Sequence, residues 1–331
     1  MRKYGVLVLI VLTACFWTSC AKKPAGPQAG TAKAEDMLSL LPKDVRGVMV
    51  VDAHRIMELE AVKKAIQENE NYPKYQEFIQ ETGIDPQKDI FFFVAAFGGE
   101  KDEESMQEGV ALLNMKYNRD LLLAKLKKEG TELTETVYDG VTIYKGVQAE
   151  SQKPFSGAFL DDSNIAVGTD AHVKKVIDVH RKKAENILKN QEISNLIKGM
   201  NKSAMAYGAF LIPSGVMKGA ASQNPMLSVF ESITSIILAF DYKDKTFLAE
   251  IKAQSPDPAK NKQIADTLNG FKALGAAAAS KEPELGELLN RVEIASAADS
   301  VKITASIPEE TAKSLGEKMK AQKAKPQNPE N

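Results

Sequence analysis

Strand-like segments in this sequence come mostly in adjacent pairs joined by short turns, and this arrangement constrains the fold more than any other feature. The pair Thr134–Tyr138 and Thr142–Tyr144 is separated by Asp139-Gly140, a dipeptide typical of type I′ turns. Three further pairs follow the same plan: Ser156–Leu160 with Asn164–Gly168, Ile233–Tyr242 with Thr246–Ala253, and Val292–Ser296 with Val301–Ser306. Strands joined by short turns pair antiparallel. With helices between the pairs, the sequence predicts an α+β fold with mainly antiparallel sheets.

The order of predicted elements occurs twice along the chain. Gly109–Tyr117 precedes Thr246–Ala253 by 137 residues, and Asp162 precedes Asp299 by the same 137. Equal offsets across two separate elements indicate an internal duplication. The length of 331 residues also predicts about two domains. We therefore expect two tandem repeats of sheet plus helices, at residues 35–200 and 201–320, followed by a polar, disordered tail at 321–331.

The first residues of the chain have the pattern of a secretory signal. Arg2 and Lys3 are followed by an apolar run from Val6 to Trp17, and small residues precede Cys20. The run of 12 residues is much shorter than the ~20 residues of a membrane-spanning helix. A transmembrane anchor is therefore the weaker interpretation of this segment.

This segment resembles the signal of bacterial lipoproteins, in which a peptidase cuts before a cysteine that carries a diacylglyceryl group. Two cysteines compete for that role. Leu12-Thr13-Ala14-Cys15 matches the lipobox best but leaves a signal of only 14 residues, whereas Trp17-Thr18-Ser19-Cys20 has the right small residues with Trp in place of the usual aliphatic one. We favour Cys20, because the Pro/Gly/Ala-rich residues 20–34 that begin with it are typical of a flexible tether. An ordinary secretory signal at 1–19 with incidental cysteines is the alternative.

The resemblance to lipoproteins implies a location for the chain. Acyl chains on Cys20 would hold it at a membrane, facing the periplasm or extracytoplasmic space. Ala21 after the cysteine fits outer-membrane sorting in lipoproteins of cells with two membranes. We therefore expect a protein of the cell envelope.

Composition excludes several classes of function. Forty-three Lys and Arg against 44 Asp and Glu give a net charge of −1, without the basic excess that nucleic-acid binding needs. Two cysteines and three histidines leave little material for a metal centre. The Gly-x-Gly-x-x-Gly, phosphate-loop, Gly-x-Ser-x-Gly and His-Glu-x-x-His motifs are absent from the sequence. We expect no nucleic-acid partner, no cofactor, no metal and no catalytic residues.

One fragment keeps an enzymatic alternative open. Asp52 and His54 follow the first predicted strand at a spacing of two, which would place both side chains on one face of a continuing strand. A carboxylate beside an imidazole can orient it as a general base. The alternative function is therefore an envelope hydrolase or modifying enzyme, while the simpler interpretation of Asp52 is a helix cap in a surface turn.

A second segment suggests a binding surface. Pro213–Ser232 combines Gly, Ala and Ser with Met217, Met226, Leu227 and Phe230. Methionine-containing, glycine-rich stretches can form adaptable apolar surfaces for ligands or partners. A connecting loop followed by a helix that packs on the sheet is the simpler interpretation.

The body of the chain resembles a group of uncharacterised bacterial cell-envelope proteins. The shared marks are short: Leu41-Pro42-Lys43-Asp44, Gly83-Ile84-Asp85, and the hairpin from Tyr138 to Tyr144. They lie in turns and carry no chemistry, so the resemblance implies no activity. We expect a lipid-anchored, non-catalytic envelope protein that binds a partner protein or an apolar ligand.

Overall fold

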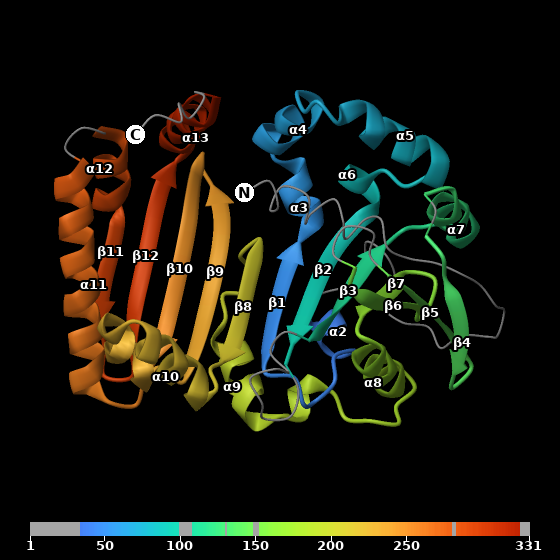
Figure 1. Ribbon diagram of the computed structural model, residues 1–331, viewed down its shortest axis with the longest axis horizontal. Helices are drawn as coiled ribbons and strands as arrows, with labels where there is room; N and C mark the ends of the chain where they lie inside the picture. The colour runs from blue at the N-terminus through green and yellow to red at the C-terminus, as the bar shows by residue number, and fades with distance from the viewer. Residues whose placement is uncertain (1–33, 99–107, 130, 148–151, 280–282, 325–331) are drawn as a thin grey trace. The chain divides into compact units, whose positions relative to one another are not determined.

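A computed structural model describes residues 34–98, 108–129, 131–147, 152–279 and 283–324. The chain forms two compact units, residues 1–198 (unit 1) and 199–331 (unit 2) (Figure 1). Each unit contains an antiparallel sheet with helices, which confirms the predicted α+β class. The predicted signal at 1–19, both cysteines and most of the linker lie outside the described residues.

Unit 1 is built on a sheet in which the strand pairs are antiparallel. The strands lie in the order β1-β2-β3-β7-β6-β5-β4 (Figure 1). Their bounds are β1 Gly47–Asp52, β2 Ile90–Phe97, β3 Gly109–Met115, β4 Thr134–Tyr138, β5 Val141–Val147, β6 Pro154–Phe159 and β7 Asn164–Gly168. Because β7 returns to pair with β3, the β4–β5 hairpin lies at one end of this sheet.

Helices cover both faces of the unit 1 sheet. Leu122 and Leu126 of α7 pack on one face, in a buried cluster with Tyr144 and Phe159. Helix α8 packs against strands β3, β5, β6 and β7. It lies across the opposite face, where Val173 and its neighbours are buried. The helices of this unit are α2 Ala34–Leu38, α3 Ala53–Glu58, α4 Glu60–Gln67, α5 Tyr72–Thr82, α6 Pro86–Asp89, α7 Arg119–Lys128, α8 Asp170–His180 and α9 Gln191–Gly199. The sheet of unit 1 is therefore the middle of three layers.

Turn and cap residues define the ends of several of these elements, including the predicted turn at Asp139-Gly140. Asp139 and Gly140 have φ values of 49° and 73°, which are the left-handed values of a type I′ turn. Asn118 caps α7 by accepting hydrogen bonds from the N–H groups of Asp120 and Leu121. Gly83 ends α5 in the left-handed conformation. These local signals come from the chain itself, so they can be identified without tertiary information.

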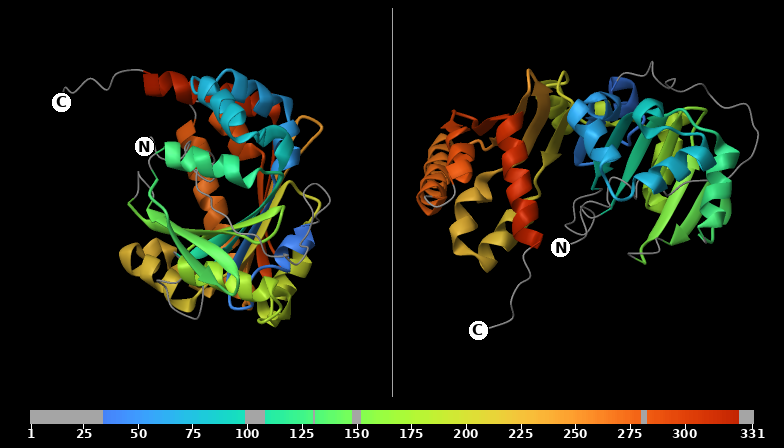
Figure 2. Two further views of the ribbon diagram at one scale, coloured as in Figure 1. Left: turned by 90° about the vertical axis from the view of Figure 1, so that its right-hand side faces the viewer. Right: turned by 90° about the horizontal axis from the view of Figure 1, so that it is seen from above.

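Unit 2 has the strand order β8-β9-β10-β12-β11, again with antiparallel pairs. The strands are β8 Ala206–Leu211, β9 Ser235–Lys243, β10 Thr246–Gln254, β11 Val292–Ser296 and β12 Ser300–Pro308. The helices are α10 Ser214–Gln223, the 3-10 segment η3 Pro225–Ser232, α11 Pro258–Ala278, α12 Pro283–Asn290 and α13 Glu309–Ala324. They lie on one side of the sheet (Figure 2), so the sheet of unit 2 has a helix side and an open side.

Two details of the unit 2 helices differ from the prediction. The last helix, α13, continues to Ala324, so the first four residues of the predicted disordered tail are helical. Residues 321–324 are mostly strong helix formers, and the first helix breaker is Pro326. Helix α12 is not predicted, because its eight residues are too few to show a clear apolar period.

The two units share part of their topology. In each, the first three strands lie side by side and the last strand of the unit pairs with the third, as β7 does with β3 and β12 with β10. The strands at the 137-residue offset, β3 and β10, therefore occupy equivalent places. Unit 1 differs by the additional β4–β5 hairpin. Shared strand order supports the internal duplication, which stays a prediction.

Candidate functional site

The structure does not bring Asp52 and His54 together. The Asp52 carboxylate caps α3 by accepting a hydrogen bond from the N–H of Arg55 at 3.0 Å. The Nε2 of His54 lies 3.5 Å from a carboxylate oxygen of Glu58, one turn further along the same helix. The structure records no hydrogen bond between the two predicted residues, and the helix cap is the role that Asp52 has.

The other two histidines belong to the packing of unit 1. Both His172 and His180 are buried on α8. The Nδ1 of His172 is 2.8 Å from the Thr169 hydroxyl, and its Nε2 is 3.1 Å from the carbonyl oxygen of Gly98. Within the part of the chain that the structure describes, no group of three or more His, Cys, Asp or Glu side chains could hold a metal ion.

The predicted apolar segment at 213–232 forms α10 and η3 on the helix side of unit 2. Phe230 packs against a core cluster formed by Val229, Ile264 and Val301, so it contributes to folding. Leu227 is half-buried, and the Met226 side chain is 61% exposed. Met217 lies on α10. Met226 is therefore more accessible than Leu227 and Phe230.

A larger apolar surface on the same side of the sheet comes from β9 and β10. Paired residues of antiparallel strands share a face, and alternate residues along a strand return to it. Val301 pairs with Ala253, and Ala253 pairs with Ile236, which places Phe240, Tyr242 and Phe247 on the helix side. Phe240 is 43% exposed and Phe247 is 36% exposed. Phe240, Tyr242 and Phe247 are called the aromatic patch.

The first turn of α13 fixes one end of the aromatic patch. The Tyr242 and Phe247 rings have centroids 4.9 Å apart. The Tyr242 hydroxyl donates a hydrogen bond to the Glu309 carboxylate, and this bond raises the pKa of Tyr242. The Lys313 ammonium, followed by the Tyr242 hydroxyl, holds the pKa of Glu309 below its usual range. These contacts position Tyr242, while Phe240 has no such anchor.

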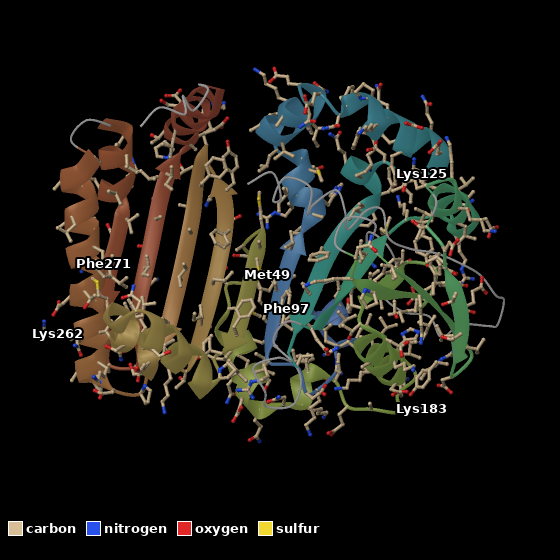
Figure 3. The ribbon with its side chains drawn as sticks, in the orientation of Figure 1. Met49, Phe97, Lys125, Lys183, Lys262 and Phe271 are labelled. Carbon is tan, nitrogen blue, oxygen red and sulfur yellow. The ribbon has the colours of Figure 1, made fainter. Side chains whose placement is uncertain are left out.

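The sequence contains a signal for this patch that is easily overlooked. Ile236 to Phe240 form a continuous apolar run, and Phe240-Asp241-Tyr242 then follows the period of two that marks one face of a strand. This pattern predicts that the aromatic residues face the core, but not that helices leave them uncovered. Outside the aromatic patch, helix α11 carries two further exposed apolar residues, Leu274 and Phe271, the second of which is labelled in Figure 3.

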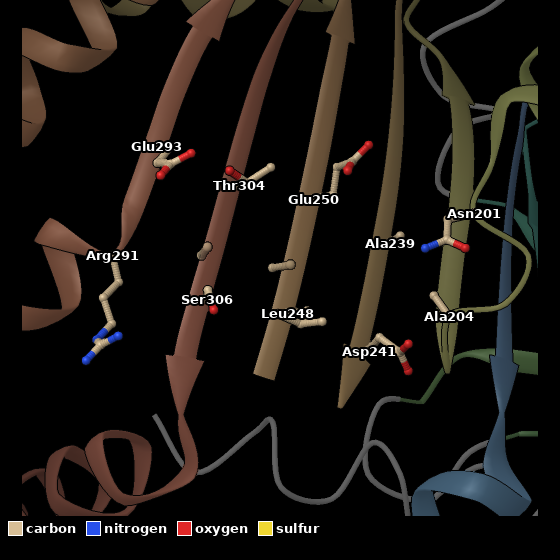
Figure 4. Close-up of a pocket in the computed structure, with 12 residues that line it drawn as sticks. Asn201, Ala204, Ala239, Asp241, Leu248, Glu250, Arg291, Glu293, Thr304 and Ser306 are labelled. Carbon is tan, nitrogen blue, oxygen red and sulfur yellow. The ribbon is translucent and has the colours of Figure 1, made fainter. Parts of the chain in front are cut away.

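The open side of the unit 2 sheet is polar. A shallow hollow of about 330 Å³ lies on it, lined among others by Asp241, Leu248, Glu250, Glu293, Thr304 and Ser306 (Figure 4). Glu250 forms an ion pair with Lys302 at 2.8 Å, and Arg291 at the rim pairs with Glu287 at 3.0 Å. Ion pairs of this kind are typical of a solvated sheet surface.

Each unit is thus an antiparallel sheet with helices, and unit 2 presents an aromatic patch on its helix side and a polar hollow on its open side. The chain belongs to the DUF3352 family, a protein family of unknown function, whose model matches residues 5–311. No curated protein matches it. Among the described residues, no helix is long and apolar enough to cross a membrane.

Solved structures of one protein, TP0453, are similar to this chain. Crystal forms III and I have TM-scores of 0.46 and 0.44 at 11% and 10% sequence identity. The matches cover 84% and 85% of this chain, and in both cases 96% of the other. Crystal form IV gives a TM-score of 0.45 at 10% identity, over 84% and 95% of the two chains.

Proposed function

We propose that this chain is a lipid-anchored, non-catalytic protein of the cell envelope that binds an apolar ligand on the helix side of unit 2. The observation that carries the binding role is the aromatic patch. Large apolar side chains on the core-facing side of a sheet are normally covered, and contiguous exposed ones mark interaction sites. Phe240 and Phe247 remain 43% and 36% exposed in that position.

The size of the aromatic patch favours a small ligand over a protein. An aromatic side chain offers about 150–250 Å² when fully covered. At the observed exposures, Phe240 and Phe247 each leave roughly 50–110 Å² accessible. A standard protein interface needs about 800 Å² per partner. The patch alone is therefore too small for a stable protein interface and suits an acyl chain or another compact apolar molecule.

A dye titration tests the binding role. We expect 1-anilinonaphthalene-8-sulfonate to bind the full chain saturably with increased fluorescence. Phe240→Ser should weaken this binding roughly 5- to 10-fold. Full burial of a large apolar side chain contributes about 1.5–3 kcal/mol, and the dye would bury only the exposed part of the Phe240 ring. The matched control is Leu274→Ser, which removes an apolar side chain that is 69% exposed on α11. Equal losses in the two variants would contradict a site at the patch.

The anchor is tested separately by native mass spectrometry of the protein extracted from membranes of its own cells. A mass of residues 20–331 plus a lipid adduct supports Cys20, and a chain that begins at residue 15 with the adduct supports Cys15. The family match begins at residue 5 and so includes the apolar segment, which supports a role for it in the family. A lipid-free chain that still contains Trp17 would overturn the anchor.

A further inference from the structure

Strand β4 at the end of the unit 1 sheet has a row of outward-facing backbone groups. In a two-residue type I′ hairpin, the residues that flank the turn, Tyr138 and Val141, exchange backbone hydrogen bonds, and every second residue does the same. The intervening residues of β4 are Glu135 and Val137. Their N–H and C=O groups therefore point away from β5, and the structure records no hydrogen bond to any of them within the described residues.

The end strand of unit 2 is protected against such pairing. The turn bond from the N–H of Ala297 to Ser300 and the bond from the N–H of Ser306 to Arg291 set the β11–β12 register. The outward carbonyls of β11 therefore belong to Val292, Ile294 and Ser296. Helix α11 supplies a donor to the first two: Lys272 to the Val292 carbonyl and Asn269 to the Ile294 carbonyl at 3.4 Å. Side chains three residues apart on one helix thus close most of this edge.

Strand β4 is short and carries the charged Glu135, but it lacks the other devices that prevent edge pairing. Proteins protect an edge with lysine, proline, a bulge or a covering element. The sequence Thr134-Glu135-Thr136-Val137-Tyr138 contains no lysine or proline, and its pairing with β5 has no bulge. Thr, Val and Tyr all favour strands. Val137 is 73% exposed, which makes it the most exposed large apolar side chain of the described residues.

We propose that β4 is a strand-addition site for an extended segment of a partner protein. The segment would pair antiparallel, with an apolar residue opposite Val137 and a Lys or Arg two positions later opposite Glu135. Directly paired side chains lie next to each other, so an aliphatic chain would cover Val137 and a cation would meet the Glu135 carboxylate. Glu135 is exposed and forms no ion pair within the described part of the chain.

A second copy of this chain fits the edge less well. A twofold pairing that uses both outward residues must place Glu135 opposite Val137 of the other copy, because residues on an antiparallel pair keep a constant sum of numbers. The carboxylate would then face an apolar side chain twice. A foreign segment with its own cation removes the mismatch.

The test uses the isotope-labelled full chain and the peptide acetyl-Thr-Val-Thr-Lys-Thr-amide, with NMR measurement of amide exchange. We expect the peptide to slow exchange at the N–H groups of Glu135 and Val137 and to shift signals of β4 only. The same peptide N-methylated at its valine should lose this effect, since it lacks one donor of the new ladder. Val137→Pro should lose it as well, because it removes an outward N–H without breaking the bonds to β5.

A charge exchange makes the orientation testable. Glu135→Lys should weaken binding of the lysine peptide about 2- to 5-fold. A peptide with Glu in place of Lys should bind this variant more tightly by the same factor, as expected for an exposed cross-strand pair. Protection that persists with the N-methylated peptide or in Val137→Pro would overturn the proposal. Protection of the same amides at high protein concentration without peptide would show that the β4 edge pairs with a second copy of this chain and not with a partner segment. This site is separate from the aromatic patch, so either can fail alone.

Discussion

The two units expose opposite parts of the same kind of sheet. In unit 1 both faces are covered by helices, and the edge at β4 presents the backbone groups of Glu135 and Val137. In unit 2 the edge at β11 is mostly closed by Asn269 and Lys272, while the helix side leaves Phe240 partly accessible. An unpaired sheet edge can bind the backbone of an extended segment, whereas an exposed aromatic patch can bind an apolar molecule. Two units of related topology can therefore serve two kinds of binding.

The difference between the covered face of unit 1 and the aromatic patch of unit 2 is large enough to measure with one substitution in each. Phe159 is 2% exposed and packs against Tyr117 and Tyr144, with the Arg119 guanidinium 4.5 Å from its ring centre. We expect Phe159→Ala to lower the free energy of unfolding of unit 1 by about 3–5 kcal/mol, because it leaves a cavity in a packed core. Phe240→Ala should cost unit 2 only about 1 kcal/mol.

Hydrogen exchange with mass spectrometry during urea unfolding measures each unit by its own peptides, so the two losses can be compared within one chain. A loss for Phe240→Ala that equals the loss for Phe159→Ala would show that the aromatic patch is a core and would remove the contrast between the faces.

The fold could be predicted from the sequence to the extent that local signals define it. Asp139-Gly140 predicts the hairpin turn, Asn118 predicts the start of α7, and Asp257 after Ser255-Pro256 predicts the start of α11. Residues 53–82 form three helices, α3, α4 and α5, separated at residue 59 and at residues 68–71. Helix α9 is not predicted, although Asn190 caps it by accepting from the N–H of Glu192.

The binding surfaces could be predicted less well, because they depend on which faces helices leave uncovered. The composition of 213–232 indicates an apolar surface, yet Phe230 is used in the core and the aromatic patch comes from β9 and β10. Asp52 and His54 are two residues apart in sequence, but a helix begins between them and turns the side chains to different partners. The edges of the sheets are set by strand order, which no local pattern reports.

The two edges can be compared by removing the closure of β11. Lys272→Met keeps the apolar stem and removes the donor to the Val292 carbonyl, so we expect unit 2 to lose about 1 kcal/mol, the net value of one hydrogen bond. Lys262→Met on the same helix is the control (Figure 3), because Lys262 pairs only with the exposed Asp266 at 2.7 Å and should change stability by less than about 0.5 kcal/mol. Urea unfolding of unit 2 measures both; equal effects would mean that the α11 donors do not close the edge.

Acid should act on both units but open only the aromatic patch. The pKa of Glu309 is held below its usual range by Lys313 and Tyr242, and the pKa of Glu81 in unit 1 is lowered by Lys125 and Lys128. A carboxylate with a lower pKa in the folded state stabilises fully above its unfolded pKa of about 4.3, and the contribution disappears as the pH falls through the folded pKa.

Loss of the Glu309 contact releases Tyr242 beside Phe247, whereas loss of the Glu81 contacts weakens the α5–α7 surface without uncovering the sheet. We therefore expect dye fluorescence at the patch to rise as the pH falls below about 4.3. Glu309→Gln, which cannot ionise, should flatten this response, and Glu81→Gln should leave it unchanged. An acid response that survives Glu309→Gln would show that the Tyr242–Glu309 contact does not limit access to the aromatic patch.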